Sequence, residues 1–119
     1  MNRDAEVIAL MRESIDLLES DSTQVTEFVD WLVARKAWQV VIEVGNKFPH
    51  LVREDSVLMY LQAHAYESLK QPEPAAELAQ AALELRADNL EEHLVVARKL
   101  EENWGLFQFS EREYREVMR

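Results

Sequence analysis

Residues 63–85, AHAYESLKQPEPAAELAQAALEL, decide the fold class of this chain. Two stretches rich in Ala, Leu and Glu, which favour helix, flank the Gln-Pro-Glu-Pro motif at 71–74. Proline ends one helix and is well tolerated in the first turn of the next. Small or aromatic residues follow one another at intervals of 3, 9, 4 and 3: Ala63, Tyr66, Ala75, Ala79 and Ala82. The stretch therefore predicts two antiparallel helices in close contact.

The same spacing recurs on both sides of this stretch. The preceding set has intervals of 3, 9, 4 and 3: Val25, Phe28, Ala37, Val41 and Val44. The following set has intervals of 3, 10, 4 and 3: Ala97, Leu100, Ser110, Tyr114 and Val117. The sets begin at Val25, Ala63 and Ala97, which makes the offset 38 and then 34. Spacings of 3 and 4 are common in any amphipathic helix, but amphipathicity does not require an interval of nine or ten at the same point in three successive pairs.

Over residues 22–119 the chain resembles the tetratricopeptide repeat family, whose period is about 34 residues. Met59 and Gln62 depart from the Trp and Leu of the family pattern. The resemblance implies a short α-solenoid of antiparallel helix pairs, with repeats at 22–49, 55–89 and 90–119. An amphipathic helix within residues 1–21, expected from its apolar stripe, precedes them. The alternative is an unrelated helical bundle whose spacing is accidental.

Composition agrees with a single all-α domain of about seven helices over residues 1–119. The chain has only two glycines and three prolines, too few for the many turns of a β-sandwich or barrel. Its 13 basic and 23 acidic residues give a net charge of −10, which argues against nucleic acid and anionic membrane surfaces as partners. There is no cysteine, which excludes disulfides and leaves the redox compartment undetermined. We expect a cytoplasmic protein, because no apolar run is long enough to span a bilayer and the N-terminal residues do not follow a signal-peptide pattern.

Helix boundaries are indicated by capping residues and breaks. The first helix is expected at about 4–19, with one apolar stripe: Ile8, Met11, Ile15 and Leu18. The expected N-caps are one of residues 21–23, then residue 55 or 56, and then Asn89. Turns are expected at 35–36 and at Gly105, and a loop at 50–54. The pattern Ser110-x-x-Glu113 predicts the start of the last helix.

The sequence does not indicate an enzyme. The three histidines, His50, His64 and His93, form no i, i+4 pair, and no nucleophile, phosphate-binding or zinc-binding motif occurs. We therefore expect no catalytic residue, no cofactor and no metal site.

The family resemblance implies that the first helix of each pair lines a concave groove. The groove candidates are Thr26, Asp30, Tyr60, His64, Glu67, Leu94, Arg98 and Glu101. With only Arg98 basic among them, the clamp that some relatives use for chaperone carboxylates is missing. A groove of this composition suits a neutral-to-basic segment with an apolar anchor.

The aromatic residues near the C-terminus are candidates for an interface: Trp104, Phe107 and Phe109. Helical arrays need a polar cap on their last apolar face, and the sequence after these residues is too short to supply one. We therefore expect that this end forms weak homodimers or that, in a longer protein, it packs against the next helix. The alternative is that the aromatic residues pack inside the last hairpin.

The expected function is a non-enzymatic protein–protein interaction module that binds a peptide or helical segment, either alone or as one domain of a larger protein. The alternative is a small dedicated chaperone or adaptor that sequesters a partner subunit, as in secretion systems. The sequence does not identify the partner.

Overall fold

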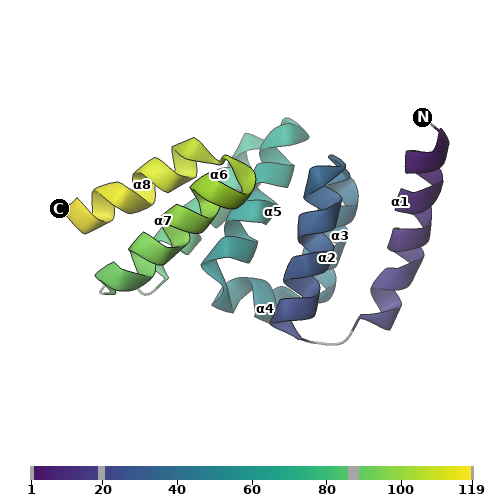
Figure 1. Cartoon of the computed structure of the whole chain (residues 1–119), viewed down its shortest axis with the longest axis horizontal. Coiled ribbons are helices and arrows are strands. Elements are labelled where there is room, and N and C mark those ends of the chain that lie inside the picture. Colours follow the sequence, from purple (N-terminus) through teal and green to yellow (C-terminus); the bar gives the residue numbers. More distant parts are fainter. Residues whose placement is uncertain (1, 19–20, 86–88, 119) are drawn as a thin grey trace.

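The computed structural model describes residues 2–18, 21–85 and 89–118, and within these the chain contains eight α-helices and no strand. The helices are α1 (Asn2–Ser14), α2 (Ser22–Ala34), α3 (Trp38–Lys47), α4 (Pro49–Glu54), α5 (Ser56–Ser68), α6 (Pro72–Glu84), α7 (Leu90–Trp104) and α8 (Phe107–Met118). They form an elongated body of 47 × 27 × 25 Å, with α1 at one end and α7 and α8 at the other (Figure 1). The prediction of an all-α chain is confirmed.

Three helices begin at equal intervals and are capped alike. Helices α2, α5 and α7 start at residues 22, 56 and 90, so the period is 34 both times. The preceding residues are Asp21, Asp55 and Asn89, and each side-chain oxygen accepts a backbone N–H of the first turn at 2.9–3.0 Å. These bonds satisfy donors that have no partner inside the helix. The predicted N-caps are confirmed.

The predicted offset between the first two pairs, from Val25 to Ala63, is wrong. Ala37, matched to Ala75 in the sequence, is the N-cap of α3, whereas Ala75 lies four residues into α6. At the observed period, the counterparts of Ala63 and Ala75 are Val29 and Val41. Both are fully buried. The interval of ten in the third set, where the other sets have nine, predicts one extra residue in the third pair. This residue is present, because α8 begins one residue later than a strict repeat of α6 would.

The first two hairpins turn in the same way. Lys36 and Lys70 have φ angles of 58° and 62°, in the left-handed region that favours glycine. The N–H of Ala37 then bonds to the Leu32 carbonyl at 3.0 Å, and the N–H of Gln71 to the Tyr66 carbonyl at 2.9 Å. This is the Schellman arrangement of a helix end. In the third hairpin Gly105, with a φ of 63°, ends α7 as predicted.

Three predicted boundaries differ from the structure. The loop expected at 50–54 is helix α4, because Pro49 begins a helix instead of only ending one. Helix α8 begins at Phe107, so Ser110 lies within it and does not cap it. Helix α1 ends at Ser14 and a 3-10 turn follows at Ile15–Leu17, while residue 19, the expected end of the first helix, lies outside the described residues.

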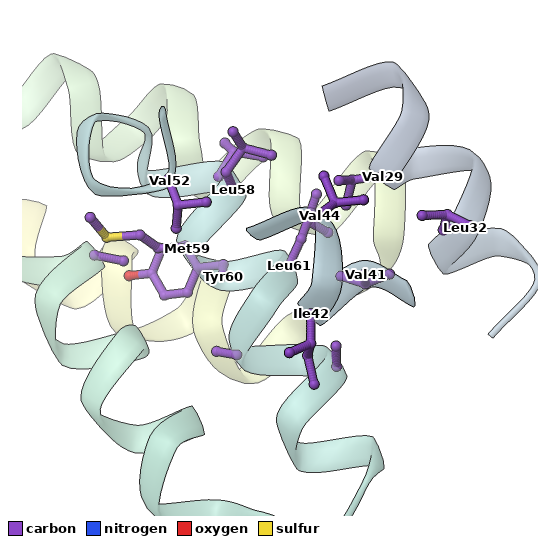
Figure 2. Packing of buried hydrophobic residues seen from close by; sticks show 14 of the residues in the cluster. Val29, Leu32, Val41, Ile42, Val44, Val52, Leu58, Met59, Tyr60 and Leu61 are labelled. Atoms are coloured by element: carbon purple, nitrogen blue, oxygen red, sulfur yellow. The ribbon is translucent and has the colours of Figure 1, made fainter. Parts of the chain in front are cut away.

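Helix α5 lies at the centre of the core. Eight of its residues are buried, and it packs against α2, α3, α4, α6 and α7. Figure 2 shows part of this core, with Leu58, Tyr60 and Leu61 of α5 near residues of α3 and α4. Ala63 and Ala75 are buried as expected. Within the described residues, no helix has both the length and the apolar character of a membrane-spanning segment.

Helix α1 covers the end of the core that lies opposite α7 and α8 (Figure 1). The predicted stripe is confirmed: Ile15 is buried, and Ile8, Met11 and Leu18 pack against the core. Two ion pairs also join this segment to α3. Arg12 contacts Glu43 at 2.9 Å, and Lys47 contacts Asp16 at 2.8 Å.

Replacing Ala75 with Leu should destabilise the protein by about 1–3 kcal/mol, because the added carbons overfill a buried contact. Ala76 is exposed on the same helix, so Ala76→Leu is the matched control and should stay within about 0.5 kcal/mol of the parent. Urea denaturation followed by circular dichroism measures both. Equal stability of the two variants would contradict the observed packing of α6.

Candidate functional site

Three hollows adjoin one another between α2, α5 and the C-terminal end of α7. The α2 hollow, of about 400 Å³, is lined in part by Thr26, Glu27, Asp30, Asp55, Lys99 and Trp104. The Trp38 hollow, of about 420 Å³, is lined in part by Lys36, Trp38, His64, Asn103 and Trp104. The Phe107 hollow, of about 410 Å³, is lined in part by His64, Glu67, Leu106, Phe107 and Phe109. Trp104 lines the first two hollows and His64 the last two, so the three lie next to one another in a row, which we call the track.

A hydrogen bond across this track connects α7 to α2. The indole Nε1–H of Trp104 donates to Oδ1 of Asp30 at 2.6 Å. The bond brings together one residue expected in the groove and one expected at a separate C-terminal interface. Since Trp104 is half-buried and bonded in this way, it forms part of the wall of the track.

His64 stands where the Trp38 and Phe107 hollows meet. Its imidazole packs edge-on against the Trp38 ring, with the ring centroids 4.8 Å apart. Burial lowers the pKa of His64, and the nearby Glu67 carboxylate opposes this shift only in part. The lowered pKa favours the uncharged imidazole near neutral pH.

Four of the eight predicted groove residues line the track: Thr26, Asp30, His64 and Glu67. A groove position for Tyr60 is wrong, because its side chain is fully buried under the last hairpin. The three α7 candidates line none of the three hollows: Leu94, Arg98 and Glu101. Glu101 instead accepts a hydrogen bond from the Tyr114 hydroxyl at 3.0 Å.

The C-terminal aromatic residues have three different environments. Phe109 is buried against the Tyr60 ring, with the centroids 5.0 Å apart, so its assignment to an exposed interface is wrong. Trp104 bonds to Asp30, as described above. Phe107 is 64% exposed. The homodimer expected through this end stays a prediction, and it now depends on Phe107 alone.

Sequence reasoning missed a buried polar triad that joins three helices. The carboxylate of Glu113 on α8 accepts from the Tyr60 hydroxyl of α5 on one oxygen, and contacts Nδ1 of His93 on α7 with the other. All three residues are at most 3% exposed. The correct period contains a signal for them, because His93 stands 34 residues after Met59 and Glu113, with the extra residue of the third pair, stands 35 after Leu78, and both of these counterparts pack in the core. Polar residues at two core positions of the repeat indicate a buried pair.

The triad lies in the core, and its members line none of the three hollows. Burial, and then the neighbouring Glu113 carboxylate, raise the pKa of Tyr60 well above its ordinary value, so its hydroxyl remains a donor. Among the described residues, no group of three or more His, Asp or Glu side chains could hold a metal ion.

Replacing Tyr60 with Phe should destabilise the protein by about 1–3 kcal/mol, because a buried carboxylate loses its donor. The matched control is Tyr114→Phe, which removes an exposed Tyr–Glu hydrogen bond. Its effect should be within about 0.5 kcal/mol. Chemical denaturation compares the two variants, and an equal loss would show that Glu113 does not depend on the Tyr60 hydroxyl.

The pKa of His64 should lie below the ordinary value of 6.5. A lowered folded-state pKa means that the unfolded chain takes up this proton first as the pH falls. The contribution of uncharged His64 to the free energy of unfolding is therefore complete above pH 6.5, and it is lost as the pH falls through the folded-state pKa. An NMR titration of the imidazole, assigned with His64→Gln, measures the value.

Glu67→Gln should lower the His64 pKa further, because the carboxylate favours the charged imidazole. A midpoint at or above 6.5 in the parent chain would contradict the burial of His64 at the junction of the two hollows.

Comparison with known proteins does not assign a function to these hollows. No protein-family model, curated protein or solved structure matched the chain. Function must therefore be argued from the track and from the residues that line it.

Proposed function

We propose that this chain is a non-enzymatic protein–protein interaction module, and that the track between α2, α5 and α7 holds a segment of its partner. The observation that carries the proposal is the row of three neighbouring hollows, which share Trp104 and His64 as lining residues. Each hollow has the volume of a small ligand pocket, which is enough for a large side chain. A row of such hollows suits an extended segment better than a single small molecule.

The arrangement of the helices supports a repeat architecture as part of this proposal. The pairs α2–α3, α5–α6 and α7–α8 begin at residues 22, 56 and 90, an interval that matches the period of tetratricopeptide repeats. In this interpretation the pairs stack as a short α-solenoid, and the first helix of each pair faces the inner side. Stacked repeats form extended concave surfaces, and such surfaces are used to bind other proteins.

The proposal can be tested with a display library of random short peptides, selected on the full chain. Peptides that bind should shift the NMR signals of the residues that line the track, with Thr26 at one end of it and Phe107 at the other. Thr26→Tyr fills the α2 hollow and should weaken their binding. Gln39→Tyr is the matched control on the exposed side of α3 and should leave binding unchanged.

Two outcomes would contradict the proposal. One is a library that yields no binder. The other is a set of binders whose shifts map to α3 and α6 and which are indifferent to Thr26→Tyr.

A further inference from the structure

We infer that the occupant of the track is a positively charged, extended segment that places a Lys or Arg side chain in the α2 hollow and an apolar side chain in the Phe107 hollow. The inference rests on the proposed function and adds to it the chemistry of the partner. It assigns different roles to the two ends of the track.

The α2 hollow carries an excess of negative charge. Among the described residues that line it are the carboxylates of Glu27, Asp30 and Asp55 and one ammonium group, that of Lys99. Asp55 also caps α5 through two backbone N–H groups, at 2.9 and 3.2 Å, so it acts mainly through its charge. A hollow with this balance attracts a cationic side chain.

Two groups in the α2 hollow are placed to contact such a cation. The Trp104 bond fixes the orientation of the Asp30 carboxylate, and a carboxylate can accept several hydrogen bonds on its two oxygens. Glu27 lies three residues before Asp30, on the same side of α2. The Trp104 indole also lines the hollow, and Trp is the side chain whose ring face attracts cations most strongly.

The Phe107 hollow has a different character. Its lining includes Leu106, Phe107 and Phe109, together with the backbone of Gly105. The Phe107 side chain is 64% exposed, so contact with an apolar side chain would remove apolar surface from water. Glu67 adds a negative charge to this hollow, while burial keeps the neighbouring His64 mainly uncharged near neutral pH.

The charge of the whole track supports the same occupant. Besides the residues of the α2 hollow, the charged lining residues are Lys36 and Glu67, so the described track has four carboxylates and two ammonium groups. The chain as a whole has a net charge of −10. An acidic segment would be repelled by both the track and the rest of the surface.

The test uses the peptides selected on the full chain. The sequences recovered should be enriched in Lys and Arg and depleted of Asp and Glu relative to the starting library, with a large apolar residue on one side of the basic position. Glu27→Gln with Asp30→Asn should weaken the binding of a recovered basic peptide about two- to thirty-fold. Asn can still accept the Trp104 indole bond, so this variant keeps the wall of the track intact.

The matched control is Glu77→Gln with Glu91→Gln, which removes two exposed carboxylates from α6 and α7 outside the hollows. It changes the net charge equally and should alter affinity much less. Peptides that bind the track without a basic excess, or that lose equal affinity with both double variants, would overturn this inference and leave the proposed function standing. A failure of all peptides to bind the track would overturn both.

Discussion

The burial of α5 is the constraint on which the other features of the structure depend. A helix enclosed by its neighbours has to bury its polar side chains together with its apolar ones, and each buried polar group needs a partner. Gln62 meets this requirement by donating its amide to the Val41 carbonyl at 2.7 Å. The close approach also explains Gly45, since a Cβ there would lie 2.5 Å from the Gln62 side chain.

The same constraint couples the last hairpin to the centre of the protein. The buried Tyr60 hydroxyl needs a polar partner, and it finds one in Glu113 of α8, whose other carboxylate oxygen contacts His93 of α7. A buried carboxylate is costly unless it is hydrogen-bonded, so the position of α8 on α5 is strongly specified. This contact explains why Tyr60, predicted to face a groove, is instead in the core.

Local signals in the sequence predicted most of the helices, but they predicted the register between successive helix pairs less well. Capping is a local effect, so neighbouring residues alone limited the first two N-caps to residues 21–23 and 55–56 and assigned the later caps to Asn89 and Gly105. The error in the offset between the first two pairs has a geometric cause. A shift of four residues is close to one helical turn, so Val25 and Val29 lie on the same face and both are buried. Helical periodicity cannot distinguish these two registers.

The candidate site was partly predictable for a related reason. Thr26, Asp30, His64 and Glu67 lie at positions that the family resemblance implied for a groove, and they line the track. The residues that α7 places along the track could not be predicted in the same way. Their position depends on how the α7–α8 hairpin packs on α5, and that packing depends on the partners of Tyr60. Because the hairpin docks there, Trp104 reaches Asp30, and Phe107 lies beside His64 in one hollow. The buried triad therefore fixes the geometry of the exposed track, although none of its three residues lines the hollows.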